Sequence, residues 1–560
     1  MEVTRRYGGT GFVHAALLAV LLMVQACGDG EGGPAPDPDS RVSLNEASRL
    51  AARATFGLPY EDIQDVAELG SDSWLVRQFE LPVGLHKATV SHLQARSARG
   101  EFDAIRQEDP DFEFLFRRLS WWHTTVTSTD VLRQRVAFAL SEIFVVSEID
   151  ALAVDPYALS DYYDMLLTHA FGNFRDLLRA VTLHPSMGIY LSHVNNRKAD
   201  PANNTFPDEN YALEVMQLFS IGLFELNEDG SRKLDATGAP IATYGNTQIR
   251  EFAKVFTGLS FGGPNAAFGN DQSWFRSPMI MFDAFHEPGE KRLLNDFVVP
   301  GGQTGMADIE SAIDNLFMHP NVGPFIGRQL IQRLVTSNPS PAYIARVAQA
   351  FNGDATGVRG DMKAVVKAVL LDPEALEAPG SVEHFGKVRE PIVRYLSLLR
   401  QFKASSPDNF YASTGFVLQE LTLQHPLSAP SVFNFFLPSH TPPGEIAQAG
   451  LVAPELQITT SSTIAGITNL VDFAVNGAFV NDFSTAPFSA AMLDISDYVA
   501  IAGDADALID RLDTVLTYGT LSAETRTAIR NTIVLVDDLR FRVNTAIYLF
   551  MISPDYAVQT

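Results

Sequence analysis

The sequence predicts a mainly α-helical protein, a large multi-helix globular body with long loops and at most a small β-hairpin. Apolar residues recur at three- and four-residue spacing along much of the chain, whereas the alternating pattern of strands is sparse. No segment repeats at a fixed period, which argues against a solenoid. Hydrophobic residues make up 46% of the 560 residues, a normal globular fraction that suffices for a large core.

The first 26 residues have the pattern of a bacterial signal peptide. Arg5 and Arg6 precede an apolar stretch, Phe12–Val24, of about 13 residues, shorter than the roughly 20 that a membrane-spanning helix needs. The tetrapeptide 24–27 reads Val-Gln-Ala-Cys and resembles a lipobox, whose cysteine is lipidated and becomes the mature N-terminus. Cys27 is the only cysteine; the alternative is a lone thiol buried in the fold. We expect residues 1–26 to be a lipoprotein signal peptide and Cys27 to be the lipidation site.

Residues 27–42 are expected to form a flexible tether, because 27–40 are rich in Gly, Asp and Pro and hold no large apolar side chain. The helical body then runs from 43 to 560, with a C-terminal subdomain from about 405. Signal peptide, lipid and tether together predict a cell-envelope protein, held at the outer membrane through the lipid on Cys27.

The formal net charge is −25, from 66 acidic and 41 basic residues. A field of this sign repels phosphate backbones and anionic headgroups, so nucleic acid is not an expected partner and membrane contact should depend on the lipid. An envelope protein is the remaining expected partner. The sequence leaves the oligomeric state, cofactors and metal content open.

The helix predicted over Asp130–Val146 is apolar almost all round, which is typical of a buried helix. Within it, Arg135 and Glu142 are seven residues apart and therefore lie within about 20° of each other on one face. Each charge needs a partner from a neighbouring helix. A structural role is the first interpretation of this pair.

The same spacing, with caps and glycine stops, predicts further helices along the chain. They are Glu209–Leu223, Thr247–Thr257, Val322–Leu334, Pro341–Phe351, Asp361–Leu371, Gly386–Phe402 and Ser522–Val536. The turn residues Asn227–Gly230 and Thr237–Gly238 predict the small hairpin.

Two loops, 194–208 and 260–278, are longer than a compact domain normally tolerates without a purpose. The first holds Asn195, Asn196 and Arg197 together with Phe206 and two prolines. This composition favours an ordered, hydrogen-bonded cover, and we expect the three polar residues to contribute to binding.

Several short motifs resemble landmarks of the bacterial DUF1800 family, and they occur in family order from about Leu44 to the C-terminus. The segment Glu209–Glu214, with Leu218 and Gly222, resembles the family's Asn-Tyr-Ala-Arg-Glu-Leu signature. The other motifs are Ala54–Gly57, Arg133–Ala137, Glu251–Gly258, His286–Lys291, His319–Asn321, Arg389–Pro391 and Ser553–Tyr556. The resemblance implies an envelope or secreted context and a mainly helical body, and the family has no agreed chemistry. At 215–217 this chain reads Val-Met-Gln where the family often has Leu-Met-Glu, so a second glutamate there is not implied.

Candidate site residues come from the helix after the Asn-rich loop and from the turn at 286–291. Asn210, Glu214 and Gln217 fall within about a 60° wedge of the helix, either as a solvated face or as the wall of a site. The hypothesis is a shared cleft, with Glu214 or Glu287 as general base or metal ligand and His286 as acid or ligand. Its remaining members are Lys291 as an electrostatic clamp, Asn210 as the orienting residue and Tyr211 in the lining.

Stronger catalytic motifs fail on their context. The run His286-Glu287 lacks the second histidine of a zincin, and Gly258–Gly262 lacks the strand–turn–helix of a nucleophile elbow. The loop that begins at Glu225 has no bidentate glutamate at its twelfth position, which argues against an EF-hand and favours a plain turn. Two functions stay open: a surface or periplasmic binding or assembly component, or an acid/base or metal-assisted hydrolase acting on an extracellular substrate.

Overall fold

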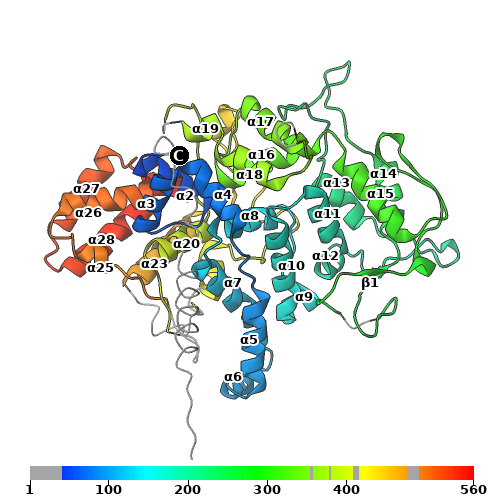
Figure 1. Cartoon of the computed structure of the whole chain (residues 1–560), viewed down its shortest axis with the longest axis horizontal. Coiled ribbons are helices and arrows are strands. Elements are labelled where there is room, and N and C mark those ends of the chain that lie inside the picture. The colour runs from blue at the N-terminus through cyan, green and yellow to red at the C-terminus, as the bar shows by residue number, and fades with distance from the viewer. Residues whose placement is uncertain are drawn as a thin grey trace, which may run out of the picture.

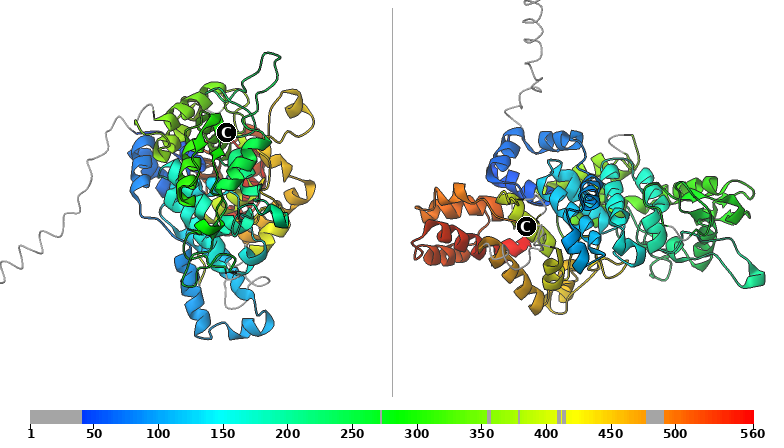
Figure 2. Two further views of the ribbon diagram at one scale, coloured as in Figure 1. Left: turned by 90° about the vertical axis from the view of Figure 1, so that its right-hand side faces the viewer. Right: turned by 90° about the horizontal axis from the view of Figure 1, so that it is seen from below.

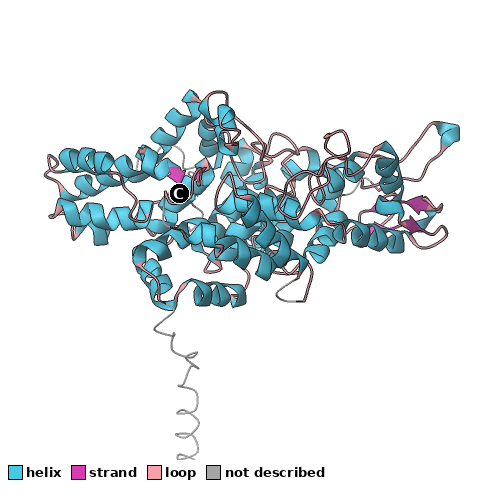
Figure 3. Cartoon of the chain, turned by 90° about the horizontal axis from the view of Figure 1, so that it is seen from above, coloured by secondary structure: helices cyan, strands magenta, loops and turns pink. Residues whose placement is uncertain are grey.

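The protein is mainly α-helical, as the sequence predicts, and its helices pack into an elongated body (Figures 1 and 3). The computed structural model describes residues 41–270, 273–353, 357–377, 380–407, 411, 415–476 and 491–560. The predicted signal peptide, Cys27 and nearly all of the predicted tether lie outside these ranges. Within the described ranges, no helix is both long and apolar enough to cross a membrane.

The first half of the body is built from short and medium helices. They are α2 (Leu44–Ala54), α3 (Tyr60–Leu69), α4 (Ser71–Glu80), α5 (Lys87–Ala98), α6 (Asp103–Glu108), α7 (Leu115–Thr127), α8 (Val131–Ser141), α9 (Asp150–Val154), α10 (Pro156–His169), α11 (Phe174–Leu183), α12 (Pro185–Tyr190) and α13 (Asn210–Gln217). Short 3-10 turns punctuate the chain at Phe112–Phe114, Pro201–Asn203, Asp283–Phe285, Leu294–Asp296 and Pro454–Gln457.

The second half continues in the same style. Its helices are α14 (Asn246–Val255), α15 (Gly305–Phe317), α16 (Val322–Leu334), α17 (Pro341–Asn352), α18 (Met362–Leu370), α19 (Pro373–Leu376), α20 (Pro391–Gln401), α21 (Gly415–Thr422), α22 (Glu445–Gln448), α23 (Ser461–Asn476), α25 (Ser496–Val499), α26 (Ala505–Leu512), α27 (Ala523–Ile533), α28 (Leu539–Ile552) and α29 (Pro554–Ala557). A π-helical turn, Asp513–Thr517, follows α26.

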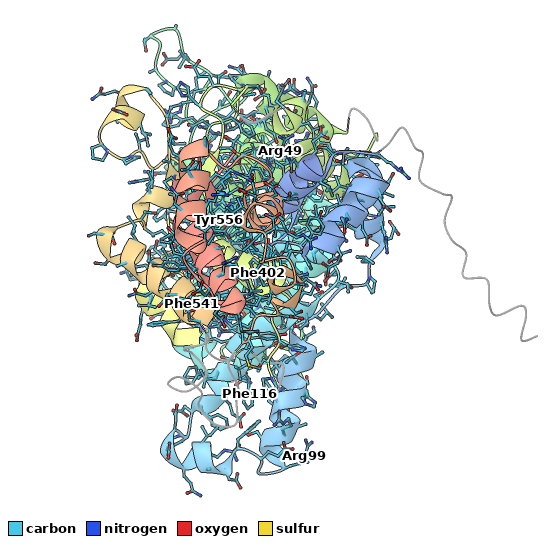
Figure 4. The ribbon with its side chains drawn as sticks, turned by 90° about the vertical axis from the view of Figure 1, so that its left-hand side faces the viewer. Arg49, Arg99, Phe116, Phe402, Phe541 and Tyr556 are labelled. Carbon is cyan, nitrogen blue, oxygen red and sulfur yellow. The ribbon has the colours of Figure 1, made fainter. Side chains whose placement is uncertain are left out.

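The C-terminus of the chain packs against its first described helix. The C-terminus lies beside α2 in Figure 1, where Arg53 donates to the carbonyl of Thr560 at 3.2 Å. Helices α25–α28 form one end of the molecule. Helices α5 and α6 form a separate arm that projects from the body in Figures 1 and 2. Figure 4 shows Arg99 at the tip of this arm and Tyr556 among the C-terminal helices. The predicted subdomain boundary near 405 stays a prediction.

Helix α8 runs through the centre and is buried on all sides, which confirms the prediction for this segment. It is shorter than the predicted Asp130–Val146, because Glu142 already caps its C-terminal end. The prediction that each charge needs a partner from a neighbouring helix is confirmed by Arg333 of α16, whose carbonyl accepts from Arg135 and whose Nε lies 3.9 Å from Glu142. Arg135 donates to the carbonyl of Arg333 at 2.7 Å, and Asn434 donates to Glu142 at 3.1 Å.

Three antiparallel pairs of two-residue strands tie loops together. They are β1 (Leu259–Ser260) with β2 (Ile280–Met281), β3 (Lys291–Arg292) with β4 (Val298–Val299), and β5 (Lys387–Val388) with β6 (Val558–Gln559). The helix predicted over Gly386–Phe402 is therefore wrong in its first turn. Glu390 precedes Pro391 and is extended, as steric contact with a proline ring favours, so α20 begins only at Pro391.

The predicted turns of the small hairpin are confirmed. Gly230 and Gly238 take positive φ angles of 75° and 84°, which glycine adopts without steric cost. Three short segments centred on 225, 233 and 241 hydrogen-bond to one another through their backbones. We call residues 223–243 the hairpin; it rises beside α17 in Figure 1.

Candidate functional site

A cavity of about 560 Å³ opens where the end of α13, the hairpin, α16 and the segment 432–439 meet the end of α8. We call it the Glu142–Arg333 pocket. Most of its wall is apolar, and its polar groups are carboxyl, guanidinium, amide and hydroxyl side chains. The lining includes Glu142, Ile143, Gln217, Leu218, Leu223, Phe224, Arg232, Phe325, Arg328, Gln329, Gln332, Arg333, Phe433 and Leu437.

Helix α16 supplies one wall through a single face. Phe325, Arg328, Gln329, Gln332 and Arg333 recur at three- and four-residue spacing, so they project on the same side of the helix. The rest of α16 is apolar and packs into the core, with Leu330 and Leu334 fully buried. A mostly buried helix therefore turns a polar stripe toward the cavity.

Asn321, at the start of α16, holds the opposite wall in place. Its amide nitrogen donates to the carbonyls of Ile221 and Phe224 at 2.8 Å each, and its amide oxygen accepts from the backbone of Leu226 at 2.9 Å. Gly222 lies between these contacts with φ near 72°, and a Cβ there would lie 2.7 Å from the Phe325 ring. The loop can reach α16 this closely only because the residue is glycine.

Beneath the pocket lies a group of buried charges, which we call the Glu390 cluster. Lys387 lies 3.1 Å from Glu455 and 3.5 Å from Glu390, and it donates to the carbonyl of Arg333 at 2.8 Å. Arg333 Nε is 3.9 Å from Glu142 Oε2. The members of the cluster are Arg135, Glu142, Arg333, Lys387, Glu390 and Glu455, all with less than a tenth of their surface exposed.

The Glu390 cluster is not fully hydrogen-bonded. Among the described atoms, Arg333 Nε and Gln329 Nε2 are buried without a hydrogen-bond partner, and both residues line the pocket. Burial, together with the neighbouring carboxylate of Glu390, raises the pKa of Glu142 to about 8. This shift favours the protonated form of Glu142, which can donate a hydrogen bond.

The predicted residues His286 and Lys291 meet at a third side chain, Asp308 on α15. His286 Nε2 lies 3.0 Å from Asp308 Oδ2, and Lys291 also contacts this oxygen. Gln303 donates to the other carboxylate oxygen at 2.6 Å. Lys291 further donates to the carbonyls of Glu287 and Gly289, so its three N–H groups are all used. We call His286, Lys291, Gln303 and Asp308 the Asp308 cluster.

Glu214 lies elsewhere, on α13. It is buried, its Oε2 has no hydrogen-bond partner among the described atoms, and burial raises its pKa to about 7. Burial raises the pKa of Tyr190 and of Tyr244, and the negative charge of Glu214 raises both further. No hydrogen bond or ion pair of the described residues joins Glu214 to His286. The shared cleft stays a prediction, as do the roles assigned to its residues.

The other two predicted residues of α13 differ in burial. Asn210 is exposed, and its amide lies 3.4 Å from the Ser192 hydroxyl. Tyr211 is fully buried: its ring stacks on His193 with centroids 3.9 Å apart, and its hydroxyl donates to Thr182 at 2.8 Å. The predicted helix Glu209–Leu223 ends early, at Gln217, where the chain turns toward Gly222.

The Asn-rich loop is ordered and hydrogen-bonded, as predicted. Asn195 accepts from Ser260 at 2.6 Å and from the backbone of Gly269 at 3.0 Å, which joins the two long loops. Asn196 closes the loop on itself by accepting from the backbone of Asp208 at 2.9 Å. Arg197 is exposed and lies 5.5 Å from the Phe268 ring. Glu287 is half-buried, and its backbone donates to Thr257 at 2.9 Å.

Sequence reasoning missed Asp308 and Arg333. Asp308 lies in the first turn of α15 and has the appearance of an ordinary acidic residue at a helix start. Arg333 stands out more, because it follows Gln329 and Gln332 on an otherwise apolar helix. That stripe was the available signal for the pocket, but the sequence does not show what faces it.

The fold and pocket define a class of protein: a large helical body with a ligand-sized, partly charged cavity. Among the described residues, no three His, Cys, Asp or Glu side chains are grouped so that they could hold a metal ion. The family model of DUF1800, described as a protein of unknown function, matches residues 49–558. The chain therefore belongs to the DUF1800 family, as its motifs indicate. No curated protein and no solved structure matches it.

Proposed function

We propose that this protein is a lipid-anchored component of the bacterial cell envelope whose helical body binds a small molecule in the Glu142–Arg333 pocket. The observation that carries the binding function is the pocket itself. Its volume of about 560 Å³ lies within the range of ligand sites, and a mostly apolar wall with a few polar groups is typical of them.

The proposed location in the cell envelope is supported by the N-terminal sequence. Residues 24–27, Val-Gln-Ala-Cys, follow a basic start and a short apolar stretch, and a Gly/Asp/Pro-rich tether follows Cys27. One lipid-modified residue would supply the anchor, and the tether would place the body away from the membrane. The outer membrane is the proposed location, with an envelope protein as a further partner.

Acid/base chemistry is the second candidate function, and the pKa of Glu142 favours it. A carboxyl group that holds its proton at neutral pH and opens onto a cavity is arranged as a general acid. Glu214, with a pKa raised to about 7, is a further candidate for proton transfer. Loss of hydrolysis in Glu142→Gln or Glu214→Gln, with ligand binding retained, would favour this alternative over binding alone.

The anchor is tested with Cys27→Ala in the full-length chain. We expect the variant to lose its acyl mass and its membrane fraction, because one residue provides the whole attachment. Mass spectrometry and fractionation measure both. An unchanged membrane fraction would remove the lipoprotein proposal and leave the pocket unaffected.

Binding is tested with N-phenyl-1-naphthylamine, an uncharged dye whose fluorescence rises in apolar surroundings. We expect Leu223→Trp, on the pocket wall, to weaken dye binding at least about tenfold by filling the cavity. Leu535→Trp is the matched control, because Leu535 is 81% exposed and lies after α27, away from the pocket. Equal dye binding by both variants would overturn the proposed pocket.

A further inference from the structure

Two arginines at the pocket, Arg232 on the hairpin and Arg328 on α16, have no acidic partner. Among the described residues, neither guanidinium forms an ion pair or a side-chain hydrogen bond. Elsewhere in this chain, which holds 66 acidic and 41 basic residues, some arginines pair with carboxylates. Arg175 and Arg346, for example, each contact two acidic side chains at 3.1 Å or less. Arg232 and Arg328 are both exposed, and what sets them apart is that they line the same cavity.

Acidic side chains do lie nearby on the hairpin, but they have other partners. Glu225 is 3.4 Å from Lys233, and Glu228 accepts from amides of α17 at 3.3 and 3.4 Å. Asp229 accepts from the hydroxyl and the backbone of Ser231 within the turn. The hairpin thus presents a cation to the pocket and directs its carboxylates elsewhere.

The two guanidinium groups are close enough to affect each other. Although Arg328 is exposed, packing around its guanidinium group and, after it, the positive charge of Arg232 lower its pKa. Arg232 is held in place by the Phe224 ring, whose centroid is 4.5 Å from the guanidinium carbon. Two like charges kept together at a cavity repel each other until an anion lies between them.

The base of the pocket adds a third guanidinium group, that of Arg333, whose Nε lies 3.9 Å from Glu142 Oε2. Burial raises the pKa of Glu142, which favours its uncharged form and leaves more of the positive charge of Arg333 uncompensated. The pocket therefore gathers three guanidinium groups, in a protein whose net charge is −25.

We propose that the Glu142–Arg333 pocket binds a small amphipathic anion, with its apolar body between α16 and the segment 432–439 and its anionic group on Arg232 and Arg328. This inference rests on the proposed binding function and names the class of ligand. A planar guanidinium pair fits a carboxylate or a phosphate, and the apolar wall selects an acyl chain or a ring over a sugar or an inorganic ion.

The test compares three probes with apolar chains of about twelve carbons and different head groups: dodecanoate, dodecan-1-ol and dodecyltrimethylammonium. Each probe is titrated against protein-bound N-phenyl-1-naphthylamine at concentrations below micelle formation, and the loss of dye fluorescence reports its binding. We expect dodecanoate to bind at least about tenfold more tightly than the alcohol, and the cation to bind most weakly. Dodecyl phosphate, included as a fourth probe, separates a preference for phosphate from one for carboxylate.

The double variant Arg232→Gln/Arg328→Gln should lower dodecanoate affinity to that of the alcohol and leave the affinity for the alcohol unchanged. Arg540→Gln is the control of the same charge type, since Arg540 lies on α28 at the far end of the molecule (Figure 1). Dye binding without any head-group preference would overturn the anion inference and leave the proposed pocket standing. Absence of dye binding in the folded wild-type protein would overturn the pocket, and the anion inference with it.

Discussion

The Asp308 cluster and the Glu390 cluster both bury opposite charges between helices, but their hydrogen bonding differs. Around Asp308, both carboxylate oxygens, both ring nitrogens of His286 and all three N–H groups of Lys291 have partners. Around Glu390, several carboxylate and guanidinium atoms have none among the described residues, and the cluster reaches a cavity. Titratable residues in a motif therefore do not by themselves mark a site; polar atoms left without partners beside a cavity are the stronger signal.

The largest expected effect on stability comes from the fully hydrogen-bonded Asp308 cluster. Asp308→Ala leaves Lys291 buried without its counter-charge, so the free energy of unfolding should fall by about 3 to 5 kcal/mol. Urea titration measures this loss. Asp296→Asn is a control, because Asp296 is exposed and, among the described residues, forms an ion pair with Arg292 alone, at 3.6 Å; asparagine also tolerates its positive φ of 55°. A loss below about 1 kcal/mol for Asp308→Ala would show that this cluster is solvated and would remove the contrast.

Glu142→Gln tests the Glu390 cluster through the pH dependence of stability. The pKa of Glu142 is raised from 4.5 to about 8, so the folded protein holds this proton more tightly than the unfolded chain. Its contribution to stability is complete below about pH 4.5 and is lost as the pH rises to about 8. The amide cannot ionise, so relative to the wild type the variant should gain about 1 to 3 kcal/mol between pH 4.5 and 8.5.

Urea midpoints of Glu142→Gln and the wild type, taken at pH 5 and at pH 8.5, measure this gain. The Asp308 cluster offers no such effect, because its carboxylate has a pKa held low by hydrogen bonds from His286, Lys291 and Gln303 despite its burial. Parallel pH profiles for the variant and the wild type would show that Glu142 is ionised in the folded protein.

A smaller effect of the same sign is expected at Glu214. Its pKa is raised from 4.5 to about 7 by burial alone, so its stabilising protonation is lost as the pH rises through about 7. Glu214→Gln should therefore gain less than about 1 kcal/mol between pH 5 and 8. Thermal midpoints across this range measure it, and a loss of stability at pH 8 would mean that the ionised carboxylate has a partner.

Local elements could be predicted closely from the sequence. Helix α16 has the predicted bounds, Val322–Leu334, because its apolar spacing is regular and its ends depend on neighbouring residues. The error at Gly386–Phe402 has a distant cause as well as the proline: Lys387 and Val388 pair with the C-terminal strand β6. No pattern within a short window shows such a partner.

The site was predicted less well than the fold. The pair Arg135 and Glu142 was recognised as buried charges that need partners, and this is confirmed. Their partners Arg333 and Asn434 come from segments far along the chain, so the pair could not be recognised as part of a cavity. His286 and Lys291 were chosen for their chemistry, and the structure shows that both side chains hydrogen-bond to Asp308.

By itself, the sequence determined the mainly helical class, the family and most local elements, because helix spacing, caps and turns act over a few residues. Only the tertiary structure decided which charges share a space and which polar atoms are left without partners. The reason is that hydrogen bonding and burial depend on residues brought together by packing. Glu142, Gln217, Arg232 and Arg333 line one pocket from four separate segments, and only the packed fold makes them a site.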